Sequence, residues 1–187
     1  MVDVQPLPPF AGALEPGRFG ADGEPGVTLP KAAAMSLVHV AGAAGAPLGL
    51  TLPTNAGEVA TAGELRALWL GPDQWLIKAP AAPFGEWSVR IAEAAPAAAV
   101  NDVSHGRATV RIEGASARDL LAAGCPLDFH AAAFPPGRAF ASLLGHLSVV
   151  IECVGADAFE VTVTRSYGRD LAQWLRHAAA EFGYRID

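Results

Sequence analysis

Residues 101–138 read NDVSHGRATVRIEGASARDLLAAGCPLDFHAAAFPPGR, and this stretch decides the expected fold. Val110 and Ile112 alternate with polar neighbours, as in a half-buried strand, and an apolar helix follows until Gly124 ends it. A loop over residues 125–138 comes next, in which three prolines restrict the backbone, and the chain then returns to a strand. The order strand, helix, long loop and strand predicts an α+β architecture.

Outward from this stretch, the sequence contains an internal repeat with a constant offset of 84 residues. WLGPDQWLIKAP at 69–80 aligns with CVGADAFEVTVT at 153–164, and each copy is typical of a β-hairpin with Gly and Asp in its turn. An amphipathic helix follows each hairpin, and Trp87 and Leu171 keep the same offset. We therefore expect two pseudo-symmetric halves of mixed or antiparallel sheet with packed helices.

The first 34 residues differ from the rest of the chain. They are rich in Pro, Gly and Ala and show little periodicity, which predicts an extended arm that lies across a neighbouring subunit. Residues 35–187 are predicted to form a single α+β domain that contains the repeat, and this length is sufficient for a hydrophobic core.

Composition argues against several classes of protein. A net charge of −6, with no cluster of Lys or Arg, argues against nucleic acid as a partner. Only 17% of the residues are charged, so we expect a protein partner to cover part of the surface. No apolar stretch approaches the ~20 residues that span a bilayer. The opening MVDVQPLPPF also lacks the pattern of a secretion signal, and we expect a cytoplasmic protein without membrane contact.

The sequence offers no motif for a catalytic, cofactor-binding or metal-binding site. The five histidines lack the spacing of helical zinc ligands, the two cysteines have no CxxC partner, and no GxGxxG follows a strand. Asp102, Ser104 and His105 are compatible with a catalytic triad or, alternatively, with turn and capping roles. Cys125 is interpreted as a packed side chain, with a reactive loop thiol as the alternative.

The loop over residues 125–138 is the candidate for a subunit contact, because connections of this length usually carry function or make contacts. Its prolines limit the entropy lost on docking, Phe129 and Phe134 add apolar area, and Arg138 offers a planar donor to a partner carboxylate. Three further arginines are candidates either for interface anchors or for intrachain ion pairs, namely Arg107, Arg165 and Arg169. The four tryptophans are interpreted as core residues.

Five motifs in this order resemble the gamma subunit of bacterial heterotetrameric sarcosine oxidase. They are GPDQWL at 71–76, DVS with a following Arg at 102–107, GCPLD at 124–128, FPPG at 134–137 and RSYGRDLAQWL at 165–175. The resemblance runs from about residue 60 to the C-terminus. That family is similar in fold to the folate-binding domain of the glycine-cleavage aminomethyltransferase, a similarity that concerns architecture and not function.

The resemblance implies a non-catalytic subunit of an oxidoreductase complex, with the alpha, beta and delta subunits as partners. It implies that the complex demethylates sarcosine oxidatively to glycine, with tetrahydrofolate as acceptor of the methyl carbon. FAD, FMN, NAD and tetrahydrofolate would then belong to the partner subunits. Two alternatives stay open: an equivalent subunit of a dehydrogenase for another N-methyl amino acid, and a stand-alone folate-binding aminomethyltransferase-like enzyme.

Overall fold

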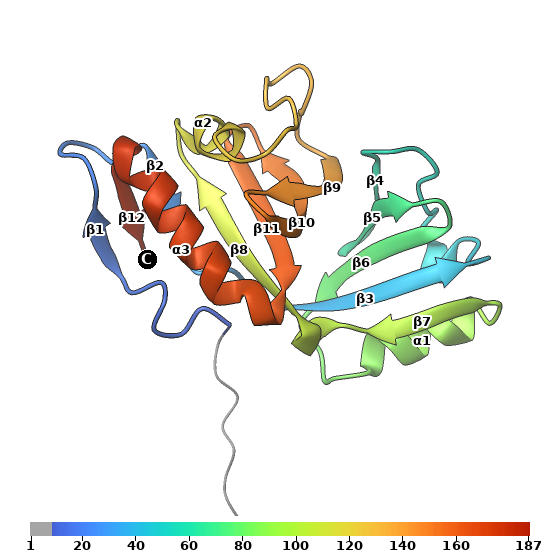
Figure 1. The fold of residues 1–187 in the computed structure, drawn as a ribbon. Helices are drawn as coiled ribbons and strands as arrows, with labels where there is room; N and C mark the ends of the chain where they lie inside the picture. Colours follow the sequence, from blue (N-terminus) through green and yellow to red (C-terminus); the bar gives the residue numbers. More distant parts are fainter. Residues whose placement is uncertain (1–8) are drawn as a thin grey trace, which may run out of the picture.

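The computed structural model describes residues 9–187, which form two β-sheets with helices on their outer faces (Figure 1). The five-stranded sheet has the order β4-β5-β6-β3-β7. Its strands are β3 (Met35–Gly42), β4 (Val59–Ala62), β5 (Leu65–Gly71), β6 (Gln74–Pro80) and β7 (Ala98–Asp102). Helix α1 (Glu86–Ala94) connects β6 to β7, and the short turn η1 (Pro47–Gly49) follows β3.

The seven-stranded sheet has the order β1-β12-β2-β8-β11-β10-β9. Its strands are β1 (Gly17–Phe19), β2 (Val27–Leu29), β8 (Arg107–Glu113), β9 (Arg138–Leu144), β10 (Leu147–Gly155), β11 (Ala158–Thr164) and β12 (Tyr184–Ile186). Helices α2 (Ala117–Ala122) and α3 (Gly168–Ala179) accompany this sheet, and Figure 1 shows α3 lying across it. The remaining short turns are η2 (Ser104–Gly106), η3 (Arg165–Tyr167) and η4 (Ala180–Phe182).

The expected pseudo-symmetric halves are present. Hairpin β5–β6 corresponds to hairpin β10–β11, and helices α1 and α3 follow them at equivalent places. Both hairpins carry an irregularity in the pairing register just before the turn, between Trp69 and Gly71 in one and between Cys153 and Gly155 in the other. The two irregularities keep the offset of the repeat, so the turn sequence and the strand geometry repeat together.

The halves differ where the N-terminal segment joins the seven-stranded sheet. In the five-stranded sheet β7 pairs directly with β3, whereas β2 lies between β8 and β12 in the other sheet. Val27 and Leu29 of β2 are buried, so the strands at residues 17–19 and 27–29 belong to the sheet of this chain. We expected an extended arm over residues 1–34 and did not predict β1 and β2, because strands of three residues are too short to show a hydrophobic period. Residues 1–8 of the expected arm lie outside the described residues.

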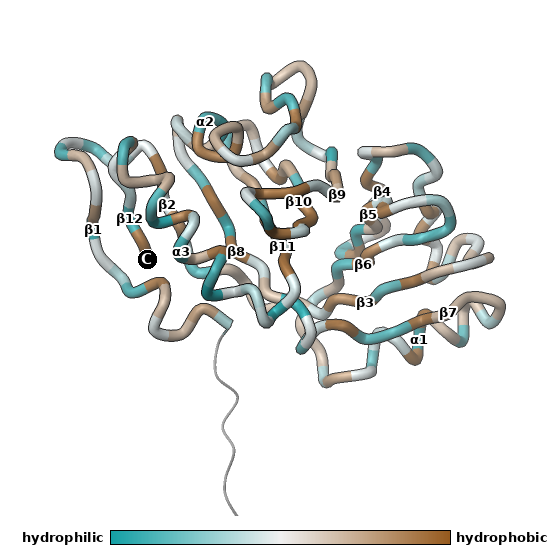
Figure 2. The backbone as a smooth tube through the Cα atoms, viewed as in Figure 1, coloured by the Kyte–Doolittle hydropathy of each residue, from teal (hydrophilic) through white to brown (hydrophobic). Residues whose placement is uncertain are grey.

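Both faces of the central strands are buried, because helices cover the outer faces and the two sheets meet on their inner faces. Leu171 and Leu175 of α3 pack into the core of the seven-stranded sheet, and Ile91 of α1 packs into the core of the five-stranded sheet. A third apolar cluster includes Leu68 and Ala139, which come from different sheets. Figure 2 shows the hydrophobic residues concentrated on the strands. Trp75 is buried and the other three tryptophans are half-buried against these cores.

Candidate functional site

The segment after β7 forms a turn in which Asp102 and Ser104 accept hydrogen bonds from backbone N–H groups. The Asp102 carboxylate accepts hydrogen bonds from the backbone N–H of Gly85 at 2.7 Å and of Ser104 at 2.9 Å. The Ser104 hydroxyl oxygen accepts a bond from the Leu37 N–H at 2.9 Å. His105 takes part in none of these bonds. Of the two roles that the sequence allowed for these residues, the structure shows turn and capping contacts.

Hydrogen bonding lowers the pKa of the Asp102 carboxyl below its usual value. Burial is the largest single effect and raises this pKa, but the bonds from Ser104 and Gly85 and the charge of His105 together lower it by more. A general base that works near neutral pH needs a pKa shifted upward. Asp102 is therefore an ionised carboxylate that ties β7 to the start of α1.

A cluster of buried charges joins the inner faces of the two sheets. Lys78 of β6 places its Nζ 2.6 Å from Glu152 of β10 and 2.7 Å from Glu160 of β11. The side chains of Lys78 and Glu152 are each 3% exposed, and that of Glu160 is 9% exposed. Arg66 of β5 closes the cluster, 3.0 Å from Glu152 and 3.1 Å from Glu160. Arg66 Nε is close to the Glu152 carboxylate but does not form a hydrogen bond with it, so this contact is an ion pair alone.

Strand register explains why these four side chains meet. The two cations are opposite each other across β5–β6, and the two carboxylates are opposite each other across β10–β11. In the repeat, the carboxylates occupy the positions that Leu68 and Leu76 occupy in the other half, and both leucines belong to the apolar cluster where the sheets meet. The same inner-face positions are thus acidic in one half and apolar in the other. This difference favours one register between the sheets.

The cluster holds Glu160 in its ionised form. Burial is the largest single effect on the pKa of Glu160 and raises it, but the charges of Lys78, Arg66 and Arg111 and the hydrogen bond from Lys78 lower it by more. The net pKa lies below the usual value of a glutamate. A carboxylate that is ionised and bound to a buried lysine is suited to hold structure and not to transfer protons.

The loop that follows α2 folds back onto its own chain. Phe129 and Phe134 are 4% and 1% exposed, and their rings lie 5.9 Å and 5.8 Å from the ring of Phe159 on β11. We predicted that these two side chains contact another subunit, but in this structure their apolar area lies in the core of this chain. A contact by this loop stays a prediction, and it would use the exposed residues between the two rings, such as His130.

Arg138, the third residue of the predicted contact, connects the two halves of the chain. Its guanidinium donates to the carbonyl of Ala56 at 3.2 Å and lies over the ring of Phe140. The backbone beside it bonds to the same loop, because Ala139 N–H donates to Gly57 C=O at 3.1 Å. Arg138 is therefore occupied within the chain, where it joins β9 to the loop before β4.

Arg118 on α2 holds the loop in place, and sequence reasoning missed it. It donates to the carbonyls of Phe129 at 2.7 Å and Phe134 at 3.2 Å, and also to that of Ala156. It also forms an ion pair with Asp157 at 3.2 Å. All these partners are distant in sequence, so nothing in the local pattern separates Arg118 from an ordinary exposed helix arginine. By contrast, Lys78 is the one charged residue in the apolar stretch WLIKAP, and this pattern in the sequence could have predicted a buried, paired lysine.

Both cysteines are buried free thiols, 6% exposed at Cys125 and 1% at Cys153. Burial is the largest effect on the pKa of Cys153 and raises it, which opposes thiolate formation. Packing is thus the role that the structure supports for both. Within residues 9–187, no group of three or more His, Cys, Asp or Glu side chains is placed to hold a metal ion. The described helices also include none with the length and apolar character needed to cross a membrane.

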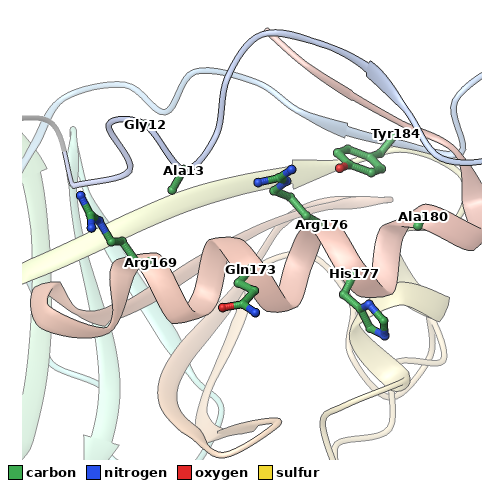
Figure 3. Close-up of a pocket in the computed structure, with 8 residues that line it drawn as sticks. All are labelled: Gly12, Ala13, Arg169, Gln173, Arg176, His177, Ala180 and Tyr184. Carbon is green, nitrogen blue, oxygen red and sulfur yellow. The ribbon is translucent and has the colours of Figure 1, made fainter.

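Candidate arginines border two of the open cavities along the N-terminal segment. One, of about 660 Å³, lies between α3 and that segment; Figure 3 shows its lining residues, Gly12, Ala13, Arg169, Gln173, Arg176, His177, Ala180 and Tyr184. The other, of about 680 Å³, lies between the same segment and β8, where Arg107 and Arg165 reach its wall. Of the three candidate anchors, Arg107 and Arg165 therefore border one cavity and Arg169 borders the other.

Sequence comparison connects the chain to one protein family. The model of the sarcosine oxidase gamma subunit family matches residues 32–181. The sarcosine oxidase subunit gamma of Corynebacterium sp. strain U-96 is 30% identical over 186 residues, which cover 95% of this chain and 90% of that protein. The protein of the same description from Arthrobacter sp. is 34% identical over 138 residues, which cover 73% of this chain and 68% of that protein.

Structural comparison agrees with the sequence. A chain of the heterotetrameric sarcosine oxidase from Corynebacterium sp. U-96, in complex with pyrrole 2-carboxylate, superposes with a TM-score of 0.81 and 26% identity over 95% of this chain and 96% of that chain. The glycine cleavage system aminomethyltransferase T from Bartonella henselae superposes with a TM-score of 0.60 and 17% identity. The match covers 86% of this chain and 47% of the aminomethyltransferase, and at this identity it shows a shared fold alone.

Proposed function

The chain belongs to the sarcosine oxidase gamma subunit family, and we propose that it serves a heterotetrameric sarcosine oxidase as a structural subunit without catalytic residues of its own. The lack of catalytic residues is inferred from the hydrogen bonds and ion pairs that already occupy the polar side chains suited to acid–base chemistry. Asp102 and Ser104 are bound to backbone amides, and Glu152 and Glu160 are bound to Lys78. Each has a pairing that explains its presence without a reaction.

We place the chemistry in the alpha, beta and delta subunits. In this proposal they convert sarcosine to glycine, transfer the methyl carbon to tetrahydrofolate, and hold FAD, FMN, NAD and the folate. The sequence supports this assignment, because no GxGxxG fingerprint for a dinucleotide follows a strand. The cytoplasmic location expected from the sequence stays a prediction.

The fold suits a rigid subunit. The buried charge cluster and the apolar cluster between the sheets both resist sliding of one half against the other. Arg138 and Arg118 fix the connecting loops to the sheets. A rigid subunit binds partners with a small loss of conformational entropy, which is what a structural component of a permanent complex requires.

Co-expression with the candidate partner subunits tests the proposal. An affinity-tagged form of this chain is expected to copurify with the other subunits in equal amounts, and the purified complex should release hydrogen peroxide or transfer the methyl carbon when sarcosine is added. Parallel assays with other N-methyl amino acids distinguish a sarcosine oxidase from a related dehydrogenase. The proposal fails if the chain alone turns over sarcosine or a folate substrate, or if it does not associate with the flavoprotein subunits.

A further inference from the structure

Helix α3 presents a basic face to solvent. Its opposite face is fully buried through Leu171 and Leu175, which pack into the core of the seven-stranded sheet. The exposed side chains of α3 are Arg169, Asp170, Gln173, Arg176 and His177, and all of them except Asp170 line one groove. Two guanidinium groups and an imidazole therefore lie on one stripe of a helix in a chain whose net charge is −6.

This stripe is one wall of the groove shown in Figure 3. The second wall is the N-terminal segment at Gly12 and Ala13, and the side chains of Arg169 and Arg176 point from α3 toward it. Phe10 and Leu14 pack against the core on either side of this segment. The groove therefore has two walls that are fixed to the domain, and its volume is about 660 Å³.

The two arginines lack the carboxylate partners that their neighbours have. Arg18 lies 3.6 Å from Glu24, and Arg185 lies 2.8 Å from Asp187. Among residues 9–187, no ion pair or hydrogen bond joins the side chain of Arg169 or Arg176 to another residue, and the groove lining contains no Asp or Glu. The two arginines are seven positions apart in the sequence, which corresponds to about 10 Å along the helix axis.

We propose that this groove binds an acidic segment of another subunit of the complex, an inference that rests on the proposed function above. Arginine is the side chain best suited to pair with carboxylates in two parallel hydrogen bonds. The two guanidinium groups start two helical turns apart, so they match a chain that carries successive carboxylates better than one small anion. An acidic segment also avoids the repulsion between arginines and cations, and it balances charges that the described chain leaves uncompensated.

The test measures the affinity of the full chain for the complex that lacks it, by biolayer interferometry at low and at physiological salt. Arg169→Glu and Arg176→Glu are compared with Arg90→Glu, which makes the same change of charge at an exposed position on α1. We expect each groove variant to bind at least about tenfold more weakly and with a smaller dependence on salt, while Arg90→Glu binds within about twofold of the unmodified chain. Circular dichroism spectra of all three variants serve as the control for correct folding.

The outcomes separate this inference from the proposed function. If the unmodified chain binds the remaining subunits and the groove variants bind equally well, the groove assignment is wrong and the function stands. If the unmodified chain does not bind them at all, the proposed function fails and the groove inference fails with it. If Arg169→Gln and Arg176→Gln weaken binding less than the Glu variants, and added salt reduces the difference, charge pairing in the groove is supported.

Discussion

Replacement of Lys78 by methionine should destabilise the chain severely. Lys78 is the only cation of the buried cluster whose side chain is nearly inaccessible, at 3% exposure, whereas Arg66 is 35% exposed. Its loss leaves both carboxylates buried with only partly solvated partners, Arg66 for Glu152 and Glu160 and Arg111 for Glu160 alone. Removal of one member of a buried ion pair costs about 3–5 kcal/mol. For a domain of this size, that free energy corresponds to a melting temperature lower by about 6–20 °C.

Chemical and thermal unfolding followed by circular dichroism measures this cost. Lys31→Met is the matched control, because it removes the other lysine of the chain at an exposed position and should change stability by no more than about 0.5 kcal/mol. A triple variant, Lys78→Met with Glu152→Leu and Glu160→Leu, should regain most of the loss, since the equivalent positions in the other half are leucines. A loss below about 1 kcal/mol for Lys78→Met would refute the role of the cluster.

Three further predictions concern stability and cofactors. Stability should fall as the pH drops below about 4.5, because Glu160 and Asp102 have lowered pKa values in the folded state and their ionised forms are lost on acidification; unfolding titrations between pH 3 and 7 measure this, and a flat profile would contradict it. Phe134→Ala should cost about 3–5 kcal/mol of unfolding free energy, because its ring lies in the chain's own core; a stable variant that fails to bind the other subunits would show an interface role instead. The purified chain should show no flavin absorbance between about 350 and 500 nm, in keeping with the lack of a dinucleotide fingerprint, and a stoichiometric flavin spectrum would refute this.

The elements that the sequence predicted best are those specified by neighbouring residues. The two hairpins and the helices after them repeat their apolar pattern and their Gly and Asp turn residues, and these signals lie within about 30 residues. The order of the strands within each sheet was harder to predict from the sequence. Insertion of β2 between β8 and β12 depends on pairing of residues 27–29 with Glu113 and with residues 184–186, which no local pattern records.

In the candidate site, too, the sequence identified residues from local patterns but could not predict their contacts with distant parts of the chain. The sequence singled out Asp102 and Ser104 but left open whether they catalyse or cap, because the alternatives differ only in which atoms the side chains meet. Prolines and aromatics in the loop after α2 suggested a binding surface, yet the aromatic rings face inward because Arg118 holds the loop against the sheet. Aromatic composition alone does not distinguish a core from an interface.

Turnover of the assembled complex tests the central claim, that this chain supports a sarcosine oxidase without supplying catalytic residues. The measurement is the rate of hydrogen peroxide release from sarcosine by complexes that contain Asp102→Asn, Ser104→Ala or His105→Ala, each normalised to the amount of intact complex. Every assembled variant should keep kcat within about threefold of the unmodified complex, because these side chains only hold a turn. A variant that assembles normally and loses about 10²-fold or more in kcat, the range of general acid–base catalysis, would contradict it.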